Sequence, residues 1–254
     1  MTAVSGLAIT PVKATRLLEV DSVTIGPSGA EGNRRIYLID DRGRMVNGKV
    51  VGELQTVVAS LEGEQLALTF SDGRVVEGPI STGRTVPTRF FSVPREARLV
   101  EGPWSEALSE LAGRPLRLVD TDGSGAVDRG ADGAVSLISR ASIERLASQA
   151  QVPEVDPRRF RMLIEVDGLE AHEEDGWVGR RSRVGEALIE WGGHVGRCLI
   201  TSRDPDSGRI DLPTLDLLRE YRGDNQTTEP LPFGIYGSVL EGGVVRVGDK
   251  VTAQ

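Results

Sequence analysis

The stretch "GRCLITSRDPDSGRID", residues 196–211, holds the only cysteine of the chain, Cys198. A lone cysteine is most often a small buried apolar residue. Here Arg197 precedes the thiol, and Arg203 and His194 lie close by in sequence, where positive charge favours the thiolate. The residues "LIT" that follow the cysteine are typical of a buried strand, which would hold the sulfur rigidly. The stretch therefore predicts a fixed, ionised thiol suited to metal ligation or sulfur transfer.

The overall charge and composition exclude several classes of partner. The 254 residues carry 30 Lys and Arg against 38 Asp and Glu, a formal net charge of -8, and only 4% are aromatic. We therefore expect no nucleic-acid partner, because such binding needs a basic field and stacking platforms. No segment approaches the roughly 18 consecutive apolar residues of a membrane helix. The start "MTAVSGLAITPVK" lacks an export signal, and one cysteine cannot form an internal disulfide, so we expect a cytoplasmic protein.

The sequence pattern divides the chain into two units. Residues 1–93 contain short alternating strands separated by glycine and aspartate turns, the spacing of a small barrel or sandwich. Two prolines in "RTVPTRFFSVPREARLV", residues 84–100, indicate the crossing to a second unit, residues 94–254. That unit mixes strands with two or three helices. We predict a mostly β fold with some helix, of the α+β class.

Three segments of the second unit have helical signals. In "GPWSEALSELAGRP" the apolar residues recur at helical spacing and Gly113 ends the pattern. Ser142 is expected to cap a second helix within "ASIERLASQAQ". A third helix is predicted in "LPTLDLLREYRG", residues 212–223.

Other metal and catalytic patterns are incomplete. One cysteine and two distant histidines, His172 and His194, do not form a zinc site. The segment "DTDGSGAVDRGA", residues 120–131, begins like a calcium loop, but Ala131 stands where the bidentate Glu is needed, so we interpret it as a solvated turn. The acidic "GLEAHEEDGW", residues 168–177, is interpreted as a surface turn, because no pattern indicates that its carboxylates are desolvated.

Several stretches resemble one known family. "GRCLITSRDPDSGRID", "TLDLLREYR" and "FGIYGSVLEGGVVRVGDKV" resemble the signature of the MOSC domain, named for the C-terminal domain of molybdenum cofactor sulfurase. Residues 9–46 are similar to the β-barrel that precedes this domain in the mitochondrial amidoxime-reducing component and its bacterial relatives. The resemblance covers nearly the whole chain in the right order. It implies an N-terminal β-barrel domain, residues 1–93, followed by a MOSC-type β-barrel domain, residues 94–254, with a few peripheral helices.

The resemblance also implies a cofactor and its ligands. In the family, the cysteine matching Cys198 binds molybdenum, whose other sulfur ligands come from a pterin that bears a phosphate. Cys198 is thus the implied metal ligand and catalytic residue of a molybdenum cofactor site. Lys13 matches the lysine of the family's "P-[IV]-K", Arg34 the arginine of "G-D-R", and Arg161 the arginine of "F-R-P-N". Such cations bind phosphate or pterin groups well.

Further positions complete this implied site or depart from it. Ser139 and Ser142 lie in a stretch resembling "S-x-A-S-L", where the second domain meets the cofactor, and Ser139 joins Arg197 in the expected cofactor-binding set. Asn33 replaces the aspartate of "G-D-R", which removes a carboxylate that could orient the arginine. Leu163 replaces the asparagine of "R-P-N", which removes a hydrogen-bonding amide. These departures bear on the cofactor more than on the fold.

Three functions are consistent with these residues. The first is a molybdenum-cofactor oxidoreductase that reduces N-hydroxylated small molecules. With no second cysteine for an iron–sulfur cluster, we expect its electrons to come from a separate flavin or iron–sulfur protein. The second is a metal-free sulfur carrier that holds a persulfide on Cys198, loaded by a cysteine desulfurase. The third is a carrier that hands on the intact molybdenum cofactor.

Overall fold

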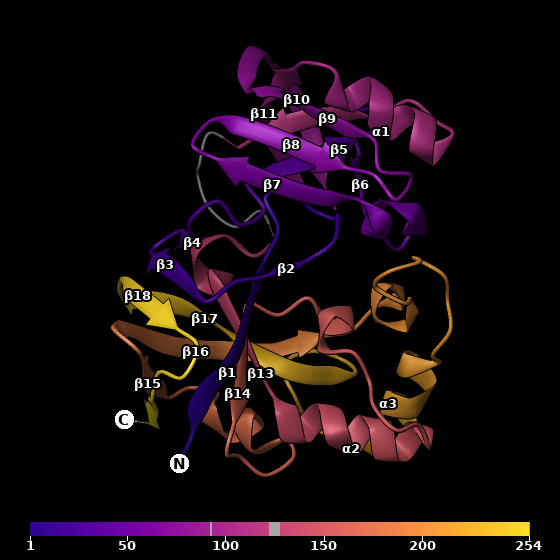
Figure 1. The fold of residues 1–254 in the computed structure, drawn as a ribbon. Helices are drawn as coiled ribbons and strands as arrows, with labels where there is room; N and C mark the ends of the chain where they lie inside the picture. The colour runs from indigo at the N-terminus through magenta and orange to yellow at the C-terminus, as the bar shows by residue number, and fades with distance from the viewer. Residues whose placement is uncertain (92, 122–127, 254) are drawn as a thin grey trace.

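The computed structural model describes residues 1–91, 93–121 and 128–253 and contains two β-rich units, drawn one above the other in Figure 1. Most of the upper unit comes from the N-terminal half of the chain and most of the lower unit from the C-terminal half. The expected α+β class, with strands predominating, is confirmed.

Two sheets of the upper unit share an apolar core, and a second apolar cluster that includes Tyr37 and Phe90 lies against the first sheet. The first has the strand order β10 (Ser81–Phe90), β11 (Val93–Glu101), β12 (Arg117–Asp120), β5 (Ile36–Ile39) and β6 (Met45–Val46), and the second has the order β7 (Val58–Glu62), β8 (Gln65–Thr69) and β9 (Val75–Pro79). Leu38, Leu66 and Leu118 come from both sheets and are fully buried in this core. Alternate residues of β8 point inward, as period-two patterning requires, whereas all four residues of β5 are buried.

Helix α1 (Trp104–Ala112) closes the upper core. Its Trp104 is 1% exposed, and the indole Nε1 donates a hydrogen bond to the Val76 carbonyl at 3.0 Å. The helix ends at Gly113, whose φ of 61° lies in the left-handed region, as the sequence predicts. A 3₁₀ turn, η1 (Gly52–Thr56), precedes β7 in the same unit.

A long sheet forms the centre of the lower unit. Its strand order is β19 (Val251–Ala253), β15 (Arg181–Val184), β16 (Ala187–Gly196), β17 (Pro232–Glu241), β13 (Val135–Ser139), β14 (Ile164–Asp167), β1 (Ala3–Ile9) and β2 (Leu18–Glu19). A smaller sheet has the order β18 (Gly243–Arg246), β3 (Ser22–Gly26) and β4 (Gly29–Ala30). Both contribute to one core, in which Ile25, Ile164 and Trp191 are buried.

Helices α2 (Arg140–Ala150) and α3 (Thr214–Arg222) pack beside this sheet, and the predicted helix in residues 212–223 is confirmed. Leu146 of α2, Leu218 of α3 and Phe233 of β17 share a cluster. Ser142 does not cap α2, contrary to expectation, because the helix begins two residues earlier at Arg140. The remaining short 3₁₀ turns are η2 (Gly130–Gly133), η3 (Pro157–Phe160), η4 (Glu173–Trp177) and η5 (Leu199–Ser202).

Strand pairing crosses the expected boundary in both directions. β1 pairs with β14 and β3 pairs with β18, so the N-terminal strands lie in the lower unit. Between them, Val12 bridges to Ile36 and Arg16 bridges to Val58, both in the upper unit. Beyond residue 93, the elements β11, α1 and β12 also belong to the upper unit. The prediction that residues 1–93 and 94–254 are separate domains therefore stays a prediction.

The segment expected to link the two units has a different structure. Residues 84–90 and 93–100 form most of the antiparallel strands β10 and β11, with Phe90 opposite Val93. Both prolines, Pro87 and Pro94, are accommodated within these strands. Residues 122–127 of the calcium-like segment lie outside the described residues. None of the described helices is both long and apolar enough to span a membrane.

Replacing Trp104 with alanine tests the upper core. Trp104→Ala removes a buried side chain and a hydrogen bond, so we expect a loss of about 3–5 kcal/mol in the free energy of unfolding, measured by urea denaturation. Val93→Ala, at a position 52% exposed on the neighbouring hairpin, is the control and should change stability by less than about 0.5 kcal/mol. Equal effects of the two substitutions would contradict the packing described for α1.

Candidate functional site

A cleft of about 470 Å³ lies between the two units. It is lined by Lys13 and Arg34 from the upper unit and by Arg161, Arg197 and Cys198 from the lower unit. These positions lie far apart in sequence, and the two-unit fold brings them to one space. Five of the six predicted site residues therefore share the cleft.

The backbone around Cys198 is fixed by a turn rather than by a strand. β16 ends at Gly196, and Cys198 precedes η5, so the strand expected after the cysteine is wrong. The Cys198 carbonyl accepts hydrogen bonds from the amide and the hydroxyl of Thr201, each at 3.0 Å. Thr201 is itself held by the Thr214 hydroxyl, which donates to its carbonyl at 2.9 Å. The thiol is exposed at the cleft, while its backbone is anchored to buried groups.

Two of the expected cationic neighbours of the thiol have other roles. The Arg203 guanidinium donates to the carbonyls of Gly208 at 2.6 Å and Lys49 at 3.1 Å, and so fixes the turn that follows η5 against the upper unit. His194 is 7% exposed, and burial lowers the pKa of its imidazole, which is therefore neutral at pH 7. His194 therefore supplies no positive charge beside Cys198, and Arg203 does not line the cleft.

Arg197 organises one wall of the cleft. Its guanidinium donates to the carbonyl of Phe233 and, at 2.8 Å, to that of Phe160. Burial lowers the pKa of Arg197 to about 9, so the side chain stays charged at pH 7. Its charge therefore contributes to the cleft, although its hydrogen bonds hold the wall together.

Lys13 and Arg34 share a carboxylate that sequence reasoning missed. The Lys13 ammonium and the Arg34 guanidinium both donate to Asp128, with the three side chains 13%, 18% and 22% exposed. Burial alone would raise the pKa of Asp128, but the two cations outweigh it and hold the pKa well below its usual range. Burial also lowers the pKa of Lys13, an effect that Asp128 opposes. The result is a partly buried, charge-coupled triad.

Asp128 lies in the segment that we interpret from sequence as a solvated turn, and this interpretation is wrong for Asp128. Its partner Lys13 is 115 residues away and Arg34 is 94 residues away. No local spacing indicates such a contact. Only the tertiary fold brings these charges together.

Arg161 adds a third cation next to this triad. Its guanidinium donates to the Thr15 carbonyl at 2.8 Å, and Arg34 donates to the Arg161 carbonyl at 2.6 Å. Burial, reinforced by the charge of Arg34, lowers the pKa of Arg161 to about 9. The two arginines are thus locked to each other and to the upper unit through backbone carbonyls.

Four residues that line the cleft have a left-handed backbone that side chains rarely adopt. The φ angles are 84° at Ala14, 54° at Arg34, 55° at Arg161 and 53° at Phe91. Each such conformation costs roughly 1–3 kcal/mol and persists only where surrounding contacts enforce it. Backbone strain is therefore concentrated where the two arginines and an exposed phenylalanine meet the cleft.

The lining of the cleft is strongly cationic. Arg129 is offset by Glu229, whose carboxylate lies 2.6 Å from its guanidinium. Among the described lining residues, Asp128 supplies the one carboxylate. The cationic lining residues are Lys13, Arg34, Lys49, Arg129, Arg161 and Arg197. Such a cleft favours a ligand with more than one negative charge.

Ser139 does not line this cleft. It is fully buried, its hydroxyl has no hydrogen-bond partner among the described residues, and its amide donates to Glu174 at 3.1 Å. The Ser142 hydroxyl donates to the same carboxylate at 2.7 Å. Glu174 is fully buried, and burial raises its pKa, so the interpretation of residues 168–177 as a surface turn is wrong at this position.

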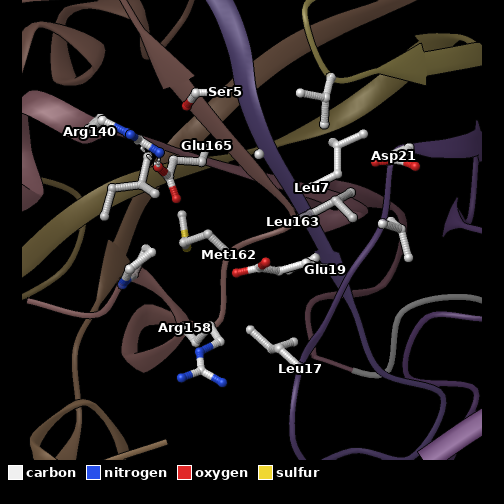
Figure 2. A pocket seen from close by; sticks show the side chains of 16 residues that line it. Ser5, Leu7, Leu17, Glu19, Asp21, Arg140, Arg158, Met162, Leu163 and Glu165 are labelled. Atoms are coloured by element: carbon white, nitrogen blue, oxygen red, sulfur yellow. Dashed lines mark hydrogen bonds and ion pairs between the residues drawn. The ribbon is translucent and has the colours of Figure 1, made fainter.

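The two departures from the family pattern lie outside the cleft lining. The Asn33 side-chain oxygen accepts a hydrogen bond from the Thr10 amide at 3.1 Å, which a carboxylate oxygen could also do. Leu163 is 3% exposed and lines a separate cavity of about 340 Å³, shown in Figure 2. Met162 lines both cavities. Leu163 therefore removes no hydrogen-bonding group from the wall near Cys198.

Fold and site together define a class: mostly β proteins in which a cationic cleft between two units exposes a thiol. The MOSC domain family matches residues 124–252, and the MOSC N-terminal beta barrel domain family matches residues 1–110. The chain belongs to the MOSC family and carries the N-terminal barrel of that family. The resemblance inferred from sequence is confirmed.

Comparison with known proteins gives similar full-length relatives. Mitochondrial amidoxime-reducing component 1 of Xenopus laevis is 27% identical over 281 residues, covering 98% of this chain and 81% of that protein. The protein of the same name from Danio rerio is 27% identical over 275 residues, covering 98% and 83%. The solved structure of the YUAD protein from Bacillus subtilis has 14% identity and a TM-score of 0.47, covering 100% of this chain and 96% of that one.

The partly buried His172 predicts a pH dependence of stability. Burial, with the charge of Arg222 adding to it, lowers the pKa of His172 from 6.5 to about 4. Between these values the unfolded chain binds more protons than the native state, so His172 reduces stability as pH falls from 6.5 towards 4.

His172→Phe removes this titration and keeps an aromatic ring beside Tyr221 and Phe233, whose centroids each lie 5.7 Å from the imidazole. Urea denaturation at pH 7 and pH 5 measures the effect. We expect the wild type to lose more stability than the variant between the two values. An equal loss in both proteins would show that His172 is not desolvated.

Proposed function

We propose that this chain binds a molybdenum cofactor in the cleft, with the Cys198 thiolate as metal ligand, and reduces N-hydroxylated small molecules. The observation that carries this proposal is an exposed thiol in a cleft whose walls hold six cations and, among the described residues, one carboxylate. The relatives named amidoxime-reducing component support the class of reaction.

The residues of the cleft fit such a group. A thiolate is a soft ligand suited to metals that bind sulfur. Lysine and arginine donate charge-assisted hydrogen bonds to phosphate, and arginine does so in a bidentate geometry. A volume of about 470 Å³ lies within the usual range of small-molecule pockets. A thiol suited to metal ligation and cations suited to phosphate thus lie in one cleft, which supports the proposal.

Each lining residue has a distinct role in this proposal. Lys13, Arg34 and Arg161 would hold the phosphate, and Arg197 keeps the adjoining wall in place through backbone carbonyls. Cys198 would hold the metal, because the hydrogen bonds to its carbonyl fix the backbone that presents the sulfur. The bound group supplies redox chemistry that the side chains of the chain lack.

The apolar part of the cleft provides a place for the substrate. Phe91, Ile200 and Tyr236 line it together with Cys198, so the body of an organic substrate can lie against carbon while its polar group faces the thiol. We propose that electrons come from a separate flavin or iron–sulfur protein, because the chain has no further cysteine to hold a cluster. A cytoplasmic location stays a prediction.

Replacing the thiol is the direct test. Wild-type protein purified from cells that make the cofactor should contain molybdenum in near-equimolar amount, and Cys198→Ser should contain almost none while keeping its fold, as measured by elemental analysis and circular dichroism. Ser148→Ala, on the exposed face of α2, is the matched control.

Other outcomes select the alternatives. The exposed thiol is also what a sulfur carrier requires. A metal-free wild type with one extra sulfur atom on Cys198, detected by mass spectrometry, would establish that function in place of the reductase. Molybdenum without turnover of an amidoxime, in the presence of a competent electron donor, would indicate a cofactor carrier.

Removing one cation tests the phosphate cluster. Arg161→Met should weaken cofactor retention about 10- to 100-fold, the factor that corresponds to a lost charged hydrogen bond of roughly 1.5–3 kcal/mol. Molybdenum content after extended dialysis measures this retention. Arg183→Met, which removes an arginine from β15 outside the cleft, should retain as much as the wild type. Similar losses from both variants would argue against a specific role for Arg161.

A further inference from the structure

Asp128 has a position that the proposed function leaves unexplained. Its carboxylate accepts hydrogen bonds from Lys13 and Arg34, the two upper-unit cations proposed to bind phosphate. It lies in the cleft lining and not behind it. The carboxylate is thus bound to the two cations inside the cleft that the ligand would enter.

We propose that the Asp128 carboxylate is an internal counter-ion that occupies the phosphate position and has to leave it before a phosphate group can bind. Asp128 would then set the affinity of the cleft for its anionic ligand and keep the cations paired until the ligand arrives. This inference rests on the proposed function only for the identity of the natural ligand.

The alternative is that Asp128 is a scaffold that orients Lys13 and Arg34, but both residues have other anchors. The Lys13 amide donates to the Ile36 carbonyl at 2.7 Å, and its ammonium lies 5.5 Å from the centre of the Phe90 ring. The Arg34 amide donates to the Thr10 carbonyl at 2.6 Å. In addition, the Arg34 guanidinium donates to the Arg161 carbonyl. The backbone of each cation is therefore anchored without Asp128, and each charged side-chain end keeps one contact that does not involve this carboxylate.

Charge balance favours exchange of the carboxylate for a phosphate. Asp128 brings one negative charge, while a phosphate monoester brings about 1.5 to 2 and three acceptor oxygens. Arg161 donates to the Thr15 carbonyl and has no carboxylate partner among the described contacts. A phosphate could therefore pair Lys13, Arg34 and Arg161 together, which one carboxylate does not do.

An internal counter-ion also stabilises the protein before its anionic ligand binds. Unpaired cations in a partly buried site are costly, and removing one partner of a buried pair is strongly destabilising. With Asp128 in place, Lys13 and Arg34 stay paired before loading. After loading, Asp128 can turn about its side-chain torsions toward solvent, where a carboxylate is well hydrated.

The test compares phosphate binding by wild type and Asp128→Asn, both in a Cys198→Ser background without molybdenum. Inorganic phosphate is titrated by calorimetry at constant ionic strength, balanced with sodium chloride. We expect Asp128→Asn to bind phosphate about tenfold more tightly, the factor for a carboxylate that occupies the site roughly nine-tenths of the time. Asp132→Asn, an exposed change nearby that lies outside the cleft, should bind like the wild type.

Thermal unfolding gives a second, independent measurement. Without phosphate, Asp128→Asn and Asp128→Ser should unfold at lower temperature than the wild type, because Lys13 and Arg34 lose their partner. Added phosphate should restore more stability to these variants than to the wild type. Weaker phosphate binding than wild type, or variants that stay unfolded even in phosphate, would identify Asp128 as a scaffold and overturn the proposal.

These results are separable from the proposed function. Phosphate binding in the Cys198→Ser background needs no thiol and no metal, so an absence of molybdenum from the wild type leaves the titration unaffected. Conversely, molybdenum bound through Cys198 together with unchanged phosphate affinity in Asp128→Asn would retain the reductase proposal and reject the internal counter-ion.

Discussion

The repulsion among Lys13, Arg34 and Arg161 is the constraint on which the site depends. The three cations converge from two units into a partly buried space, where like charges interact more strongly than in bulk solvent. The lowered pKa values of Lys13 and Arg161 reflect this desolvation. One carboxylate, from Asp128, and a set of backbone carbonyls offset the charge. The cleft is thus held together by groups that an anionic ligand can supplement or replace.

Backbone carbonyls carry a large part of that compensation. Arg197 is held by the carbonyls of Phe160 and Phe233, and Arg161 by that of Thr15. A carbonyl accepts from a guanidinium without adding a negative charge, so the walls are rigid while the cleft stays positive. Cys198 follows the same principle, since its position depends on hydrogen bonds to its carbonyl. Rigid surroundings and an exposed thiol are therefore compatible in this structure.

Local patterns predict the elements of the fold better than its contacts. Helical spacing and Gly113 locate α1 correctly, and the resemblance to the family identifies Lys13, Arg34 and Cys198 as neighbours in space. The apolar run after Cys198 does not distinguish a strand from a 3₁₀ turn, because a short run fits both. Asp128 and Glu174 escape prediction because their burial depends on pairing between distant segments, which leaves no periodic signal in the sequence.

The interleaving of the N-terminal segments between the two units limits how the molecule can move. Before residue 36 the backbone runs from β1 in the lower unit to the bridge at Val12 in the upper unit. It then returns to β2 and β3 in the lower unit and finally enters β5 in the upper unit. Several chain segments thus connect the two units. Rotation of one unit away from the other would strain all of them, unlike rotation about a single hinge. Entry to the cleft is therefore expected to depend on side chains at its rim, such as Phe91, and on small local rearrangements.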